Sequence, residues 1–233
     1  MREERQLAFD LSQAPQFGRD NFLVSGCNER AFRLIEAWPD WPTRSLLLLG
    51  PPGSGKSHLA AIFAARARAA IIPATALAHA DLVALVAQPA VVAEDVEQIR
   101  PSDEASLFHL FNLANEANTY LLLTACDKPE DWGLRTADLL SRLRLCPVIE
   151  LSAPDEGLLE AVIVKLFLDR QLIVDAEVVA FMALHIERSL DAARRLVDLL
   201  DREALARGAP ITRALVREML HAFPEEAQNH ERG

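Results

Sequence analysis

Long apolar runs, a surplus of positive charge and clustered cysteines are all missing from this sequence. Its apolar runs are too short to span a bilayer, and residues 1–5, which read M-R-E-E-R, do not form an apolar signal region. The 233 residues hold 24 Lys and Arg against 34 Asp and Glu, which gives a net charge of -10. Because a protein that neutralises many phosphates usually carries a basic patch, this balance disfavours direct sequence-specific DNA binding. We therefore expect a cytoplasmic protein that does not enter a membrane.

Cysteine is scarce and dispersed along the chain. Cys27, Cys126 and Cys146 match no metal-binding spacing and are typical of reduced thiols in the cytosol. The hydrophobic fraction of 51% and the charged fraction of 25% are those of an ordinary globular protein. The length suffices for one large domain or two modest ones, and the sequence contains no internal repeat or low-complexity segment.

A glycine-rich stretch at residues 50–57 gives the strongest chemical signal. It reads G-P-P-G-S-G-K-S and lies between an apolar run at 45–49, predicted to be a buried strand, and a helix predicted over 57–69. This is the P-loop pattern G-x-x-x-x-G-K-[ST], whose amides and following helix N-terminus point at a di- or triphosphate. Lys56 is expected to pair with the β- and γ-phosphates, and the Ser57 hydroxyl to bind Mg²⁺. The predicted nucleotide-binding residues are Gly50, Pro51, Pro52, Gly53, Ser54, Gly55, Lys56, Ser57 and His58.

Acidic side chains follow two further predicted strands. The apolar segment 89–95 ends in Glu94 and Asp95, an arrangement that suits Mg²⁺ and an attacking water beside a P-loop. Glu94 is predicted to hold Mg²⁺ and Asp95 to orient the water, although two acids can also simply end a strand. Asp127 follows the strand predicted at 120–124 and is a candidate sensor of the γ-phosphate. Alternatively, Asp127 is a structural residue of the turn that precedes Lys128 and Pro129.

The order of predicted elements indicates an α/β fold. Predicted strands at 45–49, 70–73, 89–95, 120–124 and 147–151 alternate with predicted helices at 28–37, 57–69, 75–87, 103–118 and 136–145. From residue 154 onward only helices are predicted, at about 155–170, 175–186, 189–207 and 212–222. We expect a nucleotide-binding domain at 17–152, a helical lid domain at 153–223 and a disordered tail at 224–233.

The segment before the P-loop strand leaves two questions open. The short apolar peptide at residues 6–11 is either an arm that packs on its own domain or an exposed peptide that docks in a partner's groove. In the second case its anchors are Gln6, Leu7, Phe9 and Leu11, and residues 1–16 form a binding peptide and linker. The aromatic and apolar residues between 17 and 38 are either plain core or part of an adenine pocket.

Several stretches of the chain are similar to the bacterial replication initiator DnaA. They are residues 17–31, F-H-L-F-N at 108–112, T-A-C-D-K-P at 124–129, D-L-L-S-R-L at 138–143 and I-T-R-A-L-V-R-E-M-L at 211–220. The whole pattern looks like an AAA+ module, a five-stranded parallel P-loop sheet with a C-terminal helical lid. The resemblance covers residues 17–222, and the chain ends where DnaA would continue into its DNA-binding domain. The peptide at 6–11 resembles the motif by which bacterial proteins bind the DNA polymerase sliding clamp.

This combination resembles the Hda (HdaA) family, the clamp-bound regulators that inactivate DnaA after replication begins. The resemblance implies a replisome-associated protein that binds ATP or ADP with Mg²⁺ and contacts the clamp and DnaA, and it leaves open whether the protein forms a homo-oligomer. It also implies that Arg142 is an arginine finger, which stabilises charge on the γ-phosphate bound to DnaA. Arg144 is the second choice for that role.

Two departures from the family pattern argue for weak ATP hydrolysis by this chain itself. Glu94 stands where Asp is usual, and Asp191 stands where the third lid helix of the family begins with a phosphate-binding arginine. Arg188, Arg194 or Arg195 could substitute from a neighbouring turn. The main rival interpretation is a stand-alone AAA+ ATPase, such as a loader. A DNA-binding initiator paralogue is the weakest alternative, because of the acidic balance.

Overall fold

The computed structural model describes residues 17–230, so the predicted partner-binding residues Gln6, Leu7, Phe9 and Leu11 lie outside it. Its sheet contains β1 (Ser45–Leu49), β2 (Ala70–Pro73), β3 (Ala90–Glu94), β4 (Tyr120–Ala125) and β5 (Val148–Glu150). All neighbouring strands pair in parallel, in the order β2-β3-β4-β1-β5. The predicted five-stranded parallel sheet is therefore confirmed. No helix within residues 17–230 is long and apolar enough to cross a membrane.

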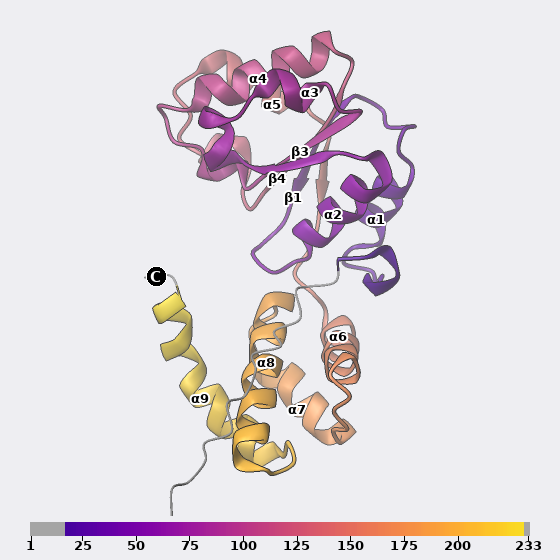
Figure 1. The fold of residues 1–233 in the computed structure, drawn as a ribbon, viewed down its shortest axis with the longest axis vertical. Coiled ribbons are helices and arrows are strands. Elements are labelled where there is room, and N and C mark those ends of the chain that lie inside the picture. Colours follow the sequence, from indigo (N-terminus) through magenta and orange to yellow (C-terminus); the bar gives the residue numbers. More distant parts are fainter. Residues whose placement is uncertain (1–16, 231–233) are drawn as a thin grey trace, which may run out of the picture.

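Helices cover both faces of the sheet (Figure 1), and alternate side chains of β1 enter two separate hydrophobic cores. Leu47 and Leu49 join the core on the side of α3, α4 and α5, whereas Leu46 and Leu48 face α1 and α2. The bounds of these helices are α1 (Glu29–Glu36), α2 (Lys56–Ala67), α3 (Leu82–Val86), α4 (Glu104–Glu116) and α5 (Ala137–Leu145). Burial on both faces explains why β1 reads as an unbroken apolar run rather than an alternating one.

Strand register brings three chain segments to one edge of the sheet. Leu49 pairs with Ala125, and Ala93 pairs with Leu123. Because the strands run in parallel, the residues that follow β1, β3 and β4 emerge together at the carboxyl edge. Gly50 N also donates a hydrogen bond to Ala125 O at 3.1 Å, which ties the start of the P-loop to the end of β4.

The helix predicted at 75–87 is wrong as a single element. The structure has a 3₁₀ helix, Ala74–His79, followed by α3. The break lies at Asp81, whose Oδ1 accepts a hydrogen bond from Ala84 N at 3.0 Å and so caps a new helix. An alanine- and leucine-rich pattern is compatible with both arrangements, and it hides the single capping residue that separates them.

Asn28, the first residue of the helix predicted at 28–37, directly precedes α1, but its side chain does not cap the helix. Its Oδ1 accepts a hydrogen bond from Ser25 N, and its Nδ2 donates one to Leu23 O, each at 2.9 Å. Asn28 is buried and therefore holds the loop at residues 23–28 in a fixed shape. This loop contributes to the candidate site described below.

The C-terminal helices are α6 (Glu156–Asp169), α7 (Ala176–His185), α8 (Leu190–Arg207) and α9 (Arg213–His230). They pack around a hydrophobic core of their own, which includes Ile163, Met182 and Leu196. Local caps set the boundaries: Asp155 accepts from Leu158 N at 2.7 Å, and Gly208 ends α8 with a φ of 59°. Because α9 runs to His230, most of the segment predicted as a disordered tail is helical in the structure.

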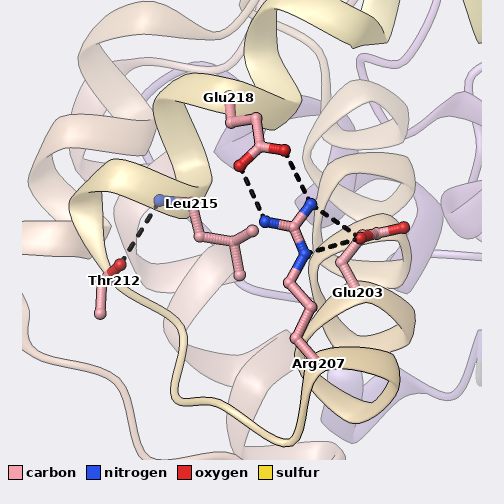
Figure 2. A network of polar contacts seen from close by, with 5 residues as sticks. All are labelled: Glu203, Arg207, Thr212, Leu215 and Glu218. Carbon is pink, nitrogen blue, oxygen red and sulfur yellow. Dashed lines mark hydrogen bonds and ion pairs between the residues drawn. The ribbon is translucent and has the colours of Figure 1, made fainter.

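Arg207 joins the end of α8 to α9 (Figure 2). Its guanidinium donates two hydrogen bonds to the carboxylate of Glu218, at 2.7 and 2.8 Å, and one to Glu203 at 3.0 Å. Since the three side chains are substantially exposed, the network orients the two helices more than it stabilises them. The connection between α8 and α9 is therefore defined by a bidentate contact as well as by the apolar core.

Candidate nucleotide-binding site

The P-loop has the geometry that its sequence predicts. Gly53 and Gly55 adopt positive φ values of 68° and 101°. Lys56, which is only 7% exposed, donates hydrogen bonds from Nζ to Gly50 O at 2.7 Å and to Pro51 O at 3.2 Å. Its ammonium is therefore held over the loop, beside the N-terminus of α2, where a negatively charged group is stabilised.

Two adjoining cavities open beside this loop. The first, here called the P-loop chamber, encloses about 420 Å³ and is lined by Phe17, Pro52, Gly53, Gly55, Lys56, Ser57, His58, Asp95, Gln98, Cys126, Leu190, Asp191 and Arg194. The second, the lid chamber, encloses about 130 Å³ and is lined by Asn21, Phe22, Leu23, Asn28, His58, Leu158, Val162, Lys165, Leu166, Asp169, Arg170, Leu190, Arg194 and Asp198. Because His58, Leu190 and Arg194 line both, the two chambers meet. Of the predicted nucleotide-binding residues, Gly50, Pro51 and Ser54 are not in the wall and instead shape the loop.

His58 connects the loop to the segment before it. Its Nε2 lies 3.0 Å from Gly18 O, and its ring lies 5.0 Å from Phe22 in an edge-on contact. Burial lowers the pKa of His58, the hydrogen bond with Gly18 opposes this effect, and the nearby charges of Arg194 and Lys165 lower the pKa further. The imidazole is therefore neutral at pH 7 and acts as a packing and hydrogen-bonding group.

The acidic residues after β3 take different positions. Asp95 lines the P-loop chamber in a left-handed conformation, with φ 54°, and its backbone N–H donates to Thr124 Oγ1 at 3.1 Å. Burial and the charge of Glu97 raise the pKa of Asp95, although Lys56 opposes them. Glu94 is not part of the chamber wall, but its Oε1 is buried and has no hydrogen-bond partner in the described structure.

These groups fit a magnesium ion held mainly through water and phosphate. Residues 17–230 contain no cluster of three or more His, Cys, Asp or Glu side chains that could form an all-protein metal cage. Magnesium usually keeps several waters and takes one or two protein oxygens together with substrate phosphates. The exposed hydroxyl of Ser57, in the chamber wall, and the unpaired carboxylate oxygen of Glu94, outside that wall, are oxygen atoms of the type that magnesium takes.

At the end of β4, Cys126 rather than Asp127 lines the P-loop chamber. The Asp127 side chain is exposed, and the Asp127 carbonyl accepts a hydrogen bond from Trp132 Nε1 at 2.9 Å. Cys126 Sγ lies 3.4 Å from Lys56 Nζ, and burial, together with Glu97, raises the pKa of its thiol. The sequence signal that could have found Cys126 is the strand end, because β4 extends to Ala125 and Cys126 is the first residue beyond it.

Arg142 lies away from this site. Its guanidinium carbon is 4.8 Å from the centre of the Phe108 ring, and it shares a surface pocket with Thr43, Arg44 and Ser45. These residues stand at the amino end of β1, whereas the P-loop follows its carboxyl end, a five-residue strand or about 16 Å away. Arg144 is exposed and pairs with Glu130 at 2.8 Å. Arg142 therefore faces away from the P-loop of its own chain.

The helix that carries Arg142 is anchored by a buried carboxylate. Glu104, only 2% exposed, accepts hydrogen bonds from Arg135 N at 2.9 Å and Thr136 N at 2.8 Å, just before α5 begins. Burial alone would raise the pKa of Glu104, but the hydrogen bonds from Thr136 and Arg135 outweigh it and hold the pKa below its ordinary value of 4.5. The carboxylate thus satisfies amides at the start of α5 that would otherwise be unpaired.

We predict that Glu104→Ala lowers the free energy of unfolding by about 1–3 kcal/mol, because it leaves two partly buried amides without an acceptor. Glu116→Ala, an exposed change on the same helix, should shift it by less than about 0.5 kcal/mol. Since the folded-state pKa is lowered, the stabilisation is present above pH 4.5 and is lost as pH falls through the lower folded value. Urea unfolding at pH 7 and in acid measures both effects, and equal losses for the two variants would contradict the assignment.

The P-loop, the parallel strand order and the helical lid over the loop together define an AAA+ fold. No protein-family model and no curated protein sequence matches the chain. Among solved structures, domain III of the Thermotoga maritima replication initiation protein DnaA is similar at 17% identity, with a TM-score of 0.75 over 90% of this chain and 98% of that one. AMPPCP-bound DnaA from Aquifex aeolicus gives 17% identity and a TM-score of 0.67, over 81% and 66% of the two chains. The Thermotoga maritima RuvB Holliday junction branch migration motor is similar at 19% identity, with a TM-score of 0.70 over 89% of this chain and 73% of that one.

These similarities confirm the predicted fold, a P-loop sheet with a C-terminal helical lid. At such identities they show the fold alone. The choice among the functions that this fold supports therefore depends on the individual side chains.

Proposed function

We propose that this chain is a regulator of replication initiation that binds ATP or ADP with Mg²⁺ and stimulates hydrolysis of ATP bound to DnaA. In this proposal residues 6–11 dock on the DNA polymerase sliding clamp, and Arg142 completes the active site of the neighbouring DnaA subunit. The observation that carries the proposal is the position of Arg142. Because this guanidinium lies at the opposite end of β1 from its own P-loop, any nucleotide that it contacts must be bound to another subunit.

Adenine nucleotide is the ligand that the two chambers fit best. The P-loop chamber carries the buried ammonium of Lys56 for the phosphates, and the lid chamber offers Phe22 and Leu23 beside it for a base. The similar DnaA structure bound to AMPPCP supports this choice. Ser57 and Glu94 are the candidate magnesium ligands, and a bound magnesium ion would neutralise phosphate charge.

Asp191 argues against vigorous hydrolysis by the chain itself. Asp191 lines the P-loop chamber, and a carboxylate there would repel the negative charge that builds up on a γ-phosphate. The rival function, a stand-alone ATPase, requires turnover of purified protein near 1 s⁻¹ or faster, in the ordinary enzyme range of about 1–10³ s⁻¹. We expect the chain to bind nucleotide and to be a poor ATPase alone.

Co-purification with the clamp tests the tethering step. We predict that the full chain retains the clamp, and that a variant lacking residues 1–12 or carrying Phe9→Ala and Leu11→Ala does not, because the apolar anchors are gone. Glu3→Ala with Glu4→Ala is the matched control, since it changes the same peptide outside the anchors. Circular dichroism should show that all variants remain folded. Retention of the clamp by the truncated chain would exclude residues 6–11 as the tether.

A further inference from the structure

The surface pocket that Arg142 shares with Arg44 is separate from the two chambers at the P-loop. It encloses about 340 Å³ at the amino end of β1 and is here called the arginine pocket. Its walls also include Phe111 and Asn115 of α4 and Leu145 of α5. No acidic residue of the described chain lines it. Because a hollow lined by charges of one sign concentrates the opposite charge, the arginine pocket is suited to an anion.

The two arginines of this pocket have no carboxylate partner within residues 17–230. Arg44 donates a hydrogen bond from Nη1 to Asn118 O at 2.8 Å, and Arg142 lies over the Phe108 ring. Arg144, on the same helix as Arg142, has an acidic partner at 2.8 Å. The guanidinium charges of the arginine pocket are therefore not neutralised by the described part of the chain.

The two guanidiniums contact opposite ends of α4. Phe108, which Arg142 covers, lies in the first half of the helix, whereas Asn118 follows its last residue, Glu116. The stretch from Phe108 to Glu116 alone measures about 12 Å, at a rise of about 1.5 Å per residue. A phosphate group is much smaller than this span. Arg44 is therefore placed to bind a different group from the one that Arg142 contacts.

Leu145 makes a protein partner a better match for the arginine pocket than a free ion. This large apolar side chain is 79% exposed and lines the same pocket. An inorganic anion would leave it in water, whereas a protein surface that supplies a carboxylate can also cover it. Arginine is enriched in protein interfaces, where its charge is matched by an opposite charge on the partner. The anion that fits here is therefore an acidic side chain.

We propose that the arginine pocket binds an acidic side chain of the DnaA subunit, with Arg44 as the cation and Leu145 as the apolar contact beside it. This proposal rests on the function proposed above and goes beyond it by separating two roles. Arg142 contacts the γ-phosphate, and Arg44 binds the subunit that carries it. A guanidinium can donate two parallel hydrogen bonds to a carboxylate, and Arg44 has donors left because Asn118 O accepts only one. The arginine pocket therefore sets how tightly DnaA binds.

Stimulation of hydrolysis of ATP preloaded on DnaA, measured against the concentration of the full chain with saturating clamp, tests the role of Arg44. Arg44→Gln keeps an amide donor for Asn118 O and removes the charge. It should raise the half-maximal concentration about tenfold or more, because a charge-assisted hydrogen bond is lost, and should keep the maximal rate. Arg66→Gln is the matched control, since Arg66 is exposed, donates to Trp38 O at 3.3 Å and lies outside the arginine pocket.

The control should stimulate DnaA as the wild type does, and circular dichroism should show that both variants are folded. A lower maximal rate at an unchanged half-maximal concentration would mean that Arg44 acts on the transferred phosphate. No change in either quantity would mean that the arginine pocket does not bind DnaA. Either result overturns the proposal.

Direct binding of ATP-loaded DnaA to the full chain separates this inference from the proposed function. Arg44→Gln should bind about tenfold more weakly at about 0.1 M salt, and the difference should shrink at about 0.5 M salt because exposed charges are screened. Leu145→Ala should also weaken binding, about threefold or more, whereas Leu205→Ala, which is 72% exposed on α8, should not. Wild-type binding by Leu145→Ala would overturn the apolar contact.

The two assignments fail in different ways. If the wild type binds DnaA and Arg142→Ala stimulates normally, the finger is wrong and the arginine pocket is judged by Arg44→Gln binding alone. If Arg142→Ala fails to stimulate and Arg44→Gln binds as the wild type does, only the arginine pocket is overturned. A wild type that does not bind DnaA overturns both.

Discussion

Arg142→Ala is expected to lower the stimulation of ATP hydrolysis in DnaA by about 10³-fold or more, the range in which arginine fingers contribute. The physical reason is that a guanidinium placed against a γ-phosphate neutralises charge that develops in the transition state, and alanine supplies none. Single-turnover hydrolysis of ATP preloaded on DnaA, with saturating clamp and this protein, measures the effect. Clamp and nucleotide binding by the variant should be unchanged, because Arg142 lies away from its own P-loop.

Arg144→Ala is the matched control for Arg142. Arg144 lies on the same helix, is exposed and pairs with Glu130, and an exposed pair of this kind contributes little to stability. We expect it to stimulate DnaA as the wild type does. Arg142→Lys should also fail, since an ammonium does not reproduce the planar two-pronged contact with phosphate oxygens. If Arg142→Ala stimulates normally, or if Arg144→Ala fails instead, the finger assignment is wrong.

Gly53→Ala should separate the lid from the P-loop and weaken ADP binding at least tenfold, because a Cβ has no room there. An added Cβ would lie 1.9 Å from Ser189 Oγ and 2.9 Å from Ser189 Cβ. Ser189 is buried and caps α8, so its side chain cannot move away without losing that cap. The hydrogen bond between Gly53 O and Leu190 N would be lost as the lid shifts. ADP titration and thermal unfolding measure the two consequences.

Gly133→Ala isolates the backbone contribution to this effect. Gly53 and Gly133 have the same φ of 68°, but a Cβ at Gly133 would meet no atom within 4 Å. The control should therefore cost about 1–2 kcal/mol of stability from the left-handed backbone alone and leave ADP binding intact. The excess cost at Gly53 then measures the overlap with the lid. If Gly53→Ala and Gly133→Ala lose the same stability and bind ADP equally well, α8 does not contact the P-loop in solution.

Local pattern predicted much of this fold. The strand at 45–49 coincides with β1, and the one at 70–73 coincides with β2, because buried parallel strands read as short apolar runs bounded by turn residues. The errors lie where one residue redirects the chain. Asp81 divides a predicted helix in two, and Arg68, with a φ of 53°, ends α2 two residues early. Such positions have no periodic signal and depend on a single hydrogen bond or dihedral angle.

The candidate site divides in the same way. The P-loop is a continuous segment, so its glycines and Lys56 could be proposed as phosphate-binding residues from their spacing alone. Cys126 could not, because the turn after β4 decides that Cys126 lines the P-loop chamber while the Asp127 side chain is exposed. From the sequence alone, Arg188, Arg194 and Arg195 were equivalent candidates to replace the arginine that the family has at the position of Asp191. The docking of α8 distinguishes Arg194, which the helical spacing turns toward both chambers.

The amino-acid order was therefore sufficient for the α/β class, the parallel sheet, the helical lid and the P-loop between β1 and α2, since each depends on neighbours within a few residues. It was not sufficient for the walls of the candidate site. Those walls join side chains from residue 17 to residue 194, and they meet only because Leu190 bonds to Gly53 while the lid packs around its own core. Contacts between such distant segments depend on how helices pack as rigid bodies, and no local pattern encodes that arrangement.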